Sequence, residues 1–215
     1  RFPANRCGPI TGIEMDGTCR PFFAKITGMN TYLVLLRGVN VGGKNKVPMA
    51  ELKKCLEALG FSSVTTYIAS GNVFLASDKY AEEVQAMVEA ALPQCFRLDD
   101  ELIRARVLTE PQLRAVIENR PPGFGEQPDT YHSDAIFLMG VDAKEAMTAF
   151  SPREGVDQVW PGDGVIYSQR VSALRTKSRL SKIVDSPHYK SMTIRSWATT
   201  TRLLEIMQSL SAENE

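Results

Sequence analysis

The clearest candidate for ligand chemistry is a glycine-rich, basic loop that follows the first long apolar run of the chain. Residues 38–45 read Gly-Val-Asn-Val-Gly-Gly-Lys-Asn, nearly the phosphate-binding pattern GxxxxGK[ST]. Asn45 stands where that pattern needs a hydroxyl for Mg²⁺, and Pro48 starts the next helix too late for its amides to face a phosphate. The loop therefore disfavours an NTP hydrolase. Two interpretations stay open: a tight strand-to-helix connection that needs glycine, and an anion-binding nest.

A second basic region lies between Arg170 and Arg195. It holds seven Lys or Arg residues and one acid, Asp185, in a chain whose formal net charge is zero. This segment is either a solvated face or a cationic patch for a phosphorylated ligand or a nucleic-acid backbone. We predict one anion site that combines both basic regions: Arg37, Gly42, Gly43, Lys44, Asn45, Lys46, Lys177, Arg179 and Arg195.

Composition excludes several classes of protein. The chain has 215 residues, 43% of them hydrophobic, as expected of a protein with an apolar core. Its balanced charge is unlike that of a dedicated nucleic-acid binder, and no apolar run approaches the roughly 18 residues of a membrane span. GxSxG and HExxH signatures are absent, and His132 and His188 lack metal-ligand spacing. We expect no metal and no cofactor, and no catalytic residue is identified, which leaves enzyme activity open.

The cysteines and the first residues of the chain bear on its location. Cys7, Cys19, Cys55 and Cys95 form neither a disulfide framework nor a CxxC pair, so we expect reduced thiols in a cytoplasmic protein. Residues 1–28 have no clear periodicity and no signal-peptide pattern. We expect them to be an irregular extension.

Apolar periodicity predicts two similar series of elements. The first has strands at 32–37, 64–68, 73–75 and 102–108 and helices at 48–59 and 78–92, the latter ended by Pro93, followed by a capped helix from Thr109. The second has strands at 135–139, 156–160, 165–168 and 192–195, helical segments at 142–150 and 178–185, and a last helix from Ser196. The Pro/Gly-rich stretch 121–128 separates them. We predict an α+β protein of two ferredoxin-like (β-α-β-β-α-β) halves, 29–120 and 130–210, joined by that linker; a single larger sheet is the alternative.

Four separated motifs resemble a known family. They are Arg-Gly-Val-Asn-Val-Gly-Gly-Lys-Asn-Lys-Val-Pro-Met at 37–49, Tyr-Ile-Ala-Ser-Gly-Asn-Val at 67–73, Ser-Arg-Leu-Ser-Lys at 178–182 and Thr-Ile-Arg-Ser-Trp at 193–197. In this order they resemble the uncharacterised bacterial family called domain of unknown function 1697, from Met29 to about Met207. Ser196 and Ala198 stand where the family pattern usually has Asn. The resemblance implies two ferredoxin-like halves in the cytoplasm and no established reaction, cofactor or partner.

Three functions are compatible with these observations. The preferred one is binding of a small anion or nucleotide, a phosphorylated small molecule, through the glycine-rich loop. The second is weak binding of RNA or single strands, for which Tyr32 and Phe74 are the candidate stacking residues of the first series. The third is a structural or interaction protein without chemistry. None of them involves a membrane.

Overall fold

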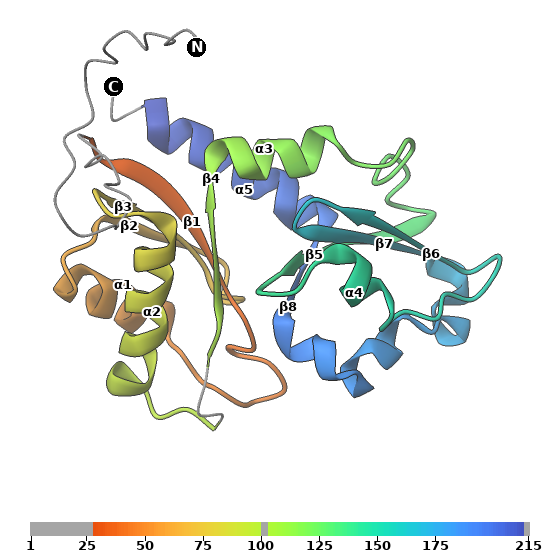
Figure 1. Cartoon of the computed structure of the whole chain (residues 1–215), viewed down its shortest axis with the longest axis horizontal. Coiled ribbons are helices and arrows are strands. Elements are labelled where there is room, and N and C mark those ends of the chain that lie inside the picture. Colours follow the sequence, from red (N-terminus) through yellow and green to blue (C-terminus); the bar gives the residue numbers. More distant parts are fainter. Residues whose placement is uncertain (1–27, 100–102, 213–215) are drawn as a thin grey trace, which may run out of the picture.

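The computed structural model describes residues 28–99 and 103–212, which form α-helices, short 3₁₀ turns and two four-stranded antiparallel sheets (Figure 1). This is the α+β class expected from the periodicity. The expected N-terminal extension lies outside the described residues, apart from Gly28.

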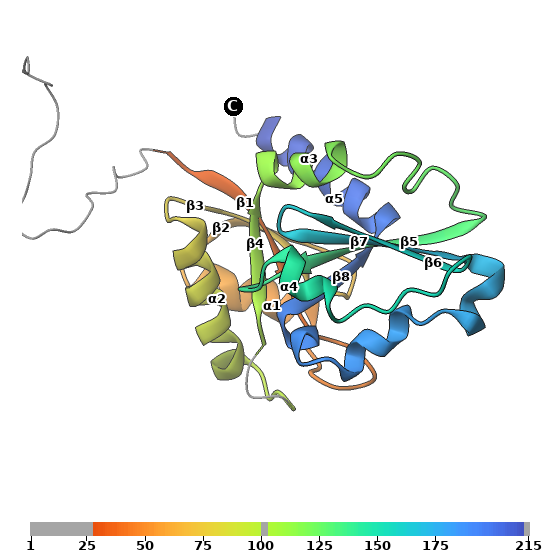
Figure 2. The same ribbon diagram turned by 45° about the vertical axis from the view of Figure 1, so that its right-hand side comes forward.

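The first sheet has the order β2-β3-β1-β4. Its elements are β1 (Asn30–Leu36), α1 (Met49–Ala58), β2 (Ser62–Tyr67), β3 (Asn72–Ser77), α2 (Ala81–Cys95) and β4 (Ala105–Thr109). Central β1 is a continuous apolar run because both of its faces are buried. Val34 and Leu36 pack under α1 and α2, whereas Leu33 and Leu35 face the opposite side. Both helices lie on the side of this sheet away from the second sheet (Figure 2).

The second sheet has the order β6-β7-β5-β8. Its strands are β5 (Tyr131–Leu138), β6 (Asp157–Gly162), β7 (Val165–Val171) and β8 (Met192–Ser196). Helix α3 (Glu110–Glu118) precedes β5, α4 (Ala143–Met147) connects β5 to β6, and α5 (Trp197–Ala212) follows β8. Three 3₁₀ turns connect β7 to β8: η1 (Ser172–Lys177), η2 (Leu180–Asp185) and η3 (Pro187–Ser191).

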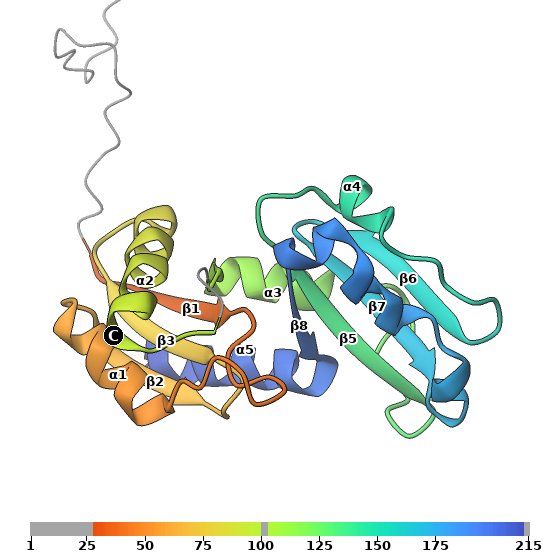
Figure 3. The ribbon, with the colours of Figure 1, turned by 90° about the horizontal axis from the view of Figure 1, so that it is seen from below.

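A shared apolar core joins the two sheets. Leu33 and Phe74 of the first sheet and Phe137 and Tyr167 of the second belong to one buried cluster. Figure 3 shows α3 and α5 lying across the region between the sheets, and both helices contribute side chains to this cluster. Phe124, from the stretch between α3 and β5, is 1% exposed, and its ring lies 5.0 Å from that of Trp197. The Pro/Gly-rich connection is therefore packed into the core that the two sheets share.

Segment 178–185 differs from its expected form, a helix with Leu180, Ile183 and Val184 inward. It is part of the 3₁₀ series, and Val184 is 55% exposed. Ser186 precedes Pro187, and its ψ of 142° is extended because the proline ring disfavours the α conformation at the preceding residue. The chain therefore makes short turns here, and these turns share this face of the second sheet with α4, whose Ala146 packs in the same apolar cluster as Leu180 and Ile183.

The expectation of reduced thiols is wrong for Cys55 and Cys95, which form a disulfide. Pro93 does not end α2, because it lies in the last turn, where its fixed φ is helical and only one hydrogen bond is lost. Continuation of α2 to Cys95 brings that residue beside Cys55 of α1, with a Cα–Cα distance of 6.4 Å.

Candidate functional site

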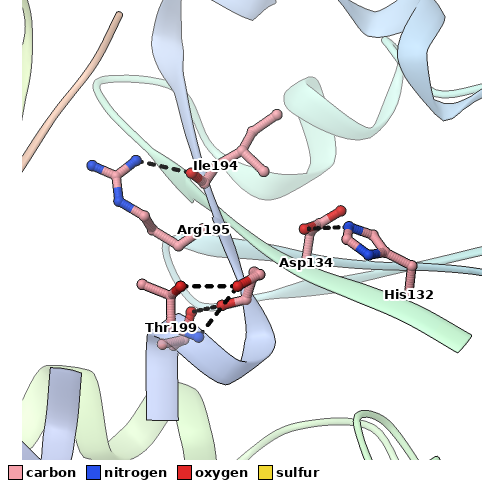
Figure 4. Close-up of polar contacts among 7 residues, drawn as sticks. His132, Asp134, Ile194, Arg195 and Thr199 are labelled. Carbon is pink, nitrogen blue, oxygen red and sulfur yellow. Dashed lines mark hydrogen bonds and ion pairs between the residues drawn. The ribbon is translucent and has the colours of Figure 1, made fainter. Parts of the chain in front are cut away.

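Arg195 of β8 connects the second sheet to the first and is only 6% exposed. Its Nε donates to Asn72 Oδ1 at 2.5 Å, and its Nη2 donates to the carbonyls of Leu36 and Ser70, both at 2.9 Å. Its Nη1 donates to Thr193 Oγ1 at 2.9 Å. The same nitrogen donates to the Ile194 carbonyl (Figure 4). All five N–H groups of the guanidinium thus have neutral protein acceptors.

Burial lowers the pKa of Arg195 to about 10, because the guanidinium loses water around its charge. The side chain is still charged at neutral pH. Its partners lie in two of the motifs noted in the sequence, 67–73 and 193–197, and at Leu36, the residue before the motif 37–49. Arg195 therefore acts within the protein as a polar connection between the sheets.

Two further arginines cross from the first sheet to the second. Arg37 and Arg104 lie opposite each other at the ends of β1 and β4, where the Arg37 amide donates to the Arg104 carbonyl at 2.8 Å. The Arg37 Nε donates to the carbonyl of Tyr189 at 3.3 Å, and its guanidinium lies 5.1 Å from the centre of that ring. Arg104 Nη1 donates to Ser191 Oγ at 2.9 Å. Like Arg195, both use neutral acceptors.

A cavity of about 280 Å³ lies between the sheets beside α3. It is lined by Arg106, Leu108, Pro111, Gln112, Ala115, Val116, Asn119, Phe137, Asp163, Gly164 and Tyr167. The Nε of Arg106 is buried and has no hydrogen-bond partner within residues 28–99 and 103–212. Burial lowers the pKa of Arg106, and the nearby Asp163 carboxylate opposes part of this effect. The cavity thus combines an arginine that has a free, buried donor with an apolar floor.

The walls of this cavity are held in place by local interactions. Thr109 and Gln112 form a capping box that starts α3, as the sequence predicts, with the Thr109 amide donating to Gln112 Oε1 at 2.9 Å. Tyr167 Oη donates to the Val116 carbonyl at 2.6 Å, and burial raises the pKa of Tyr167 to about 12. Gly164 has a φ of +65°, and a Cβ there would lie 3.3 Å from Arg106 Nη2. A residue without a side chain lets the arginine approach this turn closely.

The glycine-rich loop forms a small hairpin. Gly42 and Gly43 have positive φ at its tip, and Lys44 N donates to the Val41 carbonyl. Asn45 N donates to Asp99 Oδ2 at 2.6 Å, and Asp99 N donates back to Asn45 Oδ1 at 2.8 Å. The amides of Lys44 and Asn45, which a phosphate nest would require, are thus already used in contacts within the protein.

The predicted anion-site residues lie in several places. Lys44 and Lys46 are exposed on the loop, whereas Lys177 and Arg179 are exposed at the end of η1 and just after it. Figure 1 shows the orange loop 38–48 at the lower edge of the molecule and the light-blue segment 172–177 at the far end of the second sheet. These four residues line neither the cavity beside α3 nor a smaller hollow on the other face of the second sheet. Anion binding by this set stays a prediction.

Arg104 and Arg106 were not among the residues predicted from the sequence. Their signal is the alternation in strand 102–108, where two arginines separated by one residue alternate with Ile103, Ala105 and Val107. Period-two alternation places both arginines on one face of the strand. That pattern could have indicated a charged face, although not the cavity.

Fold and site together define an α+β protein with two antiparallel sheets and an arginine-lined cavity between them. In residues 28–99 and 103–212, no helix has the length and hydropathy needed to cross a membrane. The model of a family described as "Protein of unknown function (DUF1697)" matches residues 29–167, more than half of the chain. The chain belongs to this family, as its motifs indicate.

A solved structure is similar over most of the chain. It is described as the structure of conserved bacterial protein SP0830 from Streptococcus pneumoniae, with 27% identity and a TM-score of 0.69. The similarity covers 84% of this chain and 99% of that one. No curated protein matches the sequence.

Proposed function

We propose that this protein binds a small anionic ligand, with a carboxylate or phosphate group, in the cavity between the sheets, and that Arg106 is the binding cation. The observation that carries the proposal is the buried Nε of Arg106, which has no protein acceptor in the part of the chain that the structure describes. A buried donor without a partner costs free energy, on the order of 1–3 kcal/mol, that an anionic ligand would recover. The class of ligand is the one favoured by the sequence, but the proposed residues are different.

The charges between the sheets support an anion. Arg37, Arg104 and Arg195 do not line the cavity, but they also lie between the sheets and donate to neutral groups, so these contacts leave their positive charges uncompensated. Asp163 is the acidic residue that lines the cavity, and no ion pair within 4.0 Å joins it to Arg106 in the described ranges. An anion that bridges Arg106 to the polar groups of α3 would make charge-assisted hydrogen bonds.

The size and lining of the cavity limit the ligand. The cavity volume of about 280 Å³ is just below the roughly 300 Å³ at which pockets for drug-sized ligands start. Leu108, Phe137 and Tyr167 provide an apolar floor opposite the arginine. These features favour a compact molecule with one anionic group and an apolar body over a whole nucleotide.

We further infer that the protein consists of two ferredoxin-like halves, 29–120 and 130–210. The support is the strand order: in each sheet the first strand lies between the third and the fourth, and the second is at the edge. In the second half, 3₁₀ turns take the place of the second helix. The inner face of the first sheet packs on α3 and α5, which gives no support to RNA binding by an open sheet.

The test is ligand-induced stabilisation of the purified protein. Inorganic phosphate, acetate and benzoate are titrated while thermal unfolding is followed, for the native chain, Arg106→Gln and the control Arg175→Gln, which changes an exposed arginine of η1. An anion at about 100 times its Kd adds roughly 2.7 kcal/mol, or roughly 5–10 °C in Tm for a chain of this size. We expect this shift in the native chain and the control but not in Arg106→Gln. An equal shift in Arg106→Gln, or none in any protein, refutes the proposal.

A further inference from the structure

A second hollow, of about 110 Å³, lies on the other face of the second sheet, away from the cavity of Arg106. Its floor is formed by β5, β7 and β8, and its rim by η2 and η3. Most of the lining is apolar: Ile136, Phe150, Leu180, Ile183, Val184 and Ile194. The polar lining residues are Asp134, Ser168, Arg170, Ser181 and Tyr189. Leu180, Ser181, Ile183 and Val184 of the rim come from η2, and Tyr189 comes from η3.

Two opposite charges lie at the polar end of this hollow. Asp134 of β5 faces Ser168 of β7 across the sheet, and His132 faces Arg170, so Asp134 and Arg170 are diagonal neighbours. The Asp134 side chain is 15% exposed, and its Oδ1 lies 3.1 Å from His132 Nε2, on the side of β5 seen in Figure 4. Burial raises the pKa of Asp134, although His132 and Arg170 oppose this effect.

Two acidic residues lie near Arg170. Asp134 and Asp157 are close enough to interact with it electrostatically, yet no ion pair within 4.0 Å involves Arg170 in residues 28–99 and 103–212. The second oxygen of Asp134 and the guanidinium of Arg170 thus provide an acceptor and a donor at one end of an apolar hollow.

We propose that this hollow is a second binding site, for a small neutral ligand that joins a short branched aliphatic body to a carboxamide head. The amide N–H₂ donates to the Asp134 carboxylate, and the amide oxygen accepts from Arg170. The aliphatic body lies against Ile136, Phe150 and Ile183. A carboxylate head is disfavoured because it faces Asp134, and an ammonium head is disfavoured because it faces Arg170. The volume, about 110 Å³, equals roughly four water molecules and suits a molecule of the size of isobutyramide.

The first arm of the test compares head groups on one body. Isobutyramide, isobutyrate and isobutylamine are titrated into the protein, and the methyl resonances of Ile136, Ile183 and Ile194 are followed by NMR. We expect isobutyramide to shift them with a Kd in the millimolar range, and the two charged compounds to bind about tenfold more weakly or not at all. No shift up to about 100 mM amide, or equal binding of the three compounds, overturns the proposal.

The second arm locates the site. Ser181→Trp places a large ring in the hollow from η2, whereas Lys182→Trp adds the same ring to an exposed neighbour that does not line it. We expect amide binding to be lost in Ser181→Trp and kept in Lys182→Trp. Arg170→Leu removes the donor and the positive charge, so isobutylamine should then bind better than isobutyramide. Binding that survives in Ser181→Trp, or an unchanged head-group preference in Arg170→Leu, overturns the proposal. Arg106 takes no part here, so the two proposals fail separately.

Discussion

Replacement of Arg195 by methionine tests the polar connection between the two sheets. Methionine keeps the apolar stem but removes every donor of the guanidinium, which leaves Asn72 Oδ1 and the Ser70 carbonyl without the arginine hydrogen bonds. The Leu36 carbonyl keeps one long contact, from Thr193 Oγ1 at 3.3 Å. The variant therefore separates the contribution of the hydrogen bonds to the free energy of unfolding from the contribution of side-chain volume.

The expected loss follows from two opposing effects. Each buried acceptor left without a donor costs about 1–3 kcal/mol, and roughly two such groups are created. Removal of a buried charge without a carboxylate partner offsets part of this cost. We expect Arg195→Met to lower the free energy of unfolding by about 3 kcal/mol, or roughly 6–12 °C in Tm. Total stabilities are about 5–15 kcal/mol, so this change is readily measured.

Urea unfolding of the native chain, Arg195→Met and the exposed control Arg175→Met measures the effect. The control should change stability by less than about 0.5 kcal/mol. A double-mutant cycle with Asn72→Ala then reports the coupling of the 2.5 Å hydrogen bond. If Arg195→Met is as stable as its control, or if the cycle gives no coupling, the network contributes nothing and the reasoning is refuted.

Two further predictions concern groups in other parts of the fold. Because the Cys55–Cys95 disulfide closes a loop of 40 residues, its reduction should lower the free energy of unfolding by up to about 4 kcal/mol. Dithiothreitol should destabilise the native chain but not Cys55→Ser. The same response in both proteins would contradict the prediction. Burial raises the pKa of Asp134, so its carboxyl group holds a proton more tightly in the native state than in the unfolded state. The native chain therefore loses stability as the pH rises from the unfolded-state pKa of Asp134 to its native-state pKa. Asp134→Asn removes this loss, and its stability relative to the native chain, from urea unfolding at several pH values, should increase from acid to neutral pH; a constant difference would argue against a raised pKa.

Local patterns in the sequence predict much of the secondary structure. The capping box at Thr109 and the cap at Asp142, whose side chain accepts from the Glu145 amide at 2.7 Å, are confirmed. Ser196, expected to start the last helix, accepts from the Thr199 amide. Each of these interactions joins residues three positions apart, so the chain geometry of one helical turn is enough to specify them.

The predicted anion site shows what local sequence patterns do not predict, namely which basic residues become buried. The sequence shows the types of basic residues and the segments that hold them, but it does not distinguish an arginine that becomes buried from a lysine that stays exposed. Arg195 became an internal connection, Lys44 and Lys177 stayed at the surface, and Arg106 came to line a cavity. Burial depends on which elements pack together, and no local pattern encodes that.

By itself, the sequence determined the order and type of nearly all elements, since strand alternation, helical periodicity and caps act over a few residues. Only the tertiary structure decided that Arg195 meets Asn72, 123 positions away, that Phe124 enters the shared core, and that Cys55 meets Cys95. Those contacts form when two sheets and their helices dock, and the docking minimises exposed apolar surface over the whole chain at once.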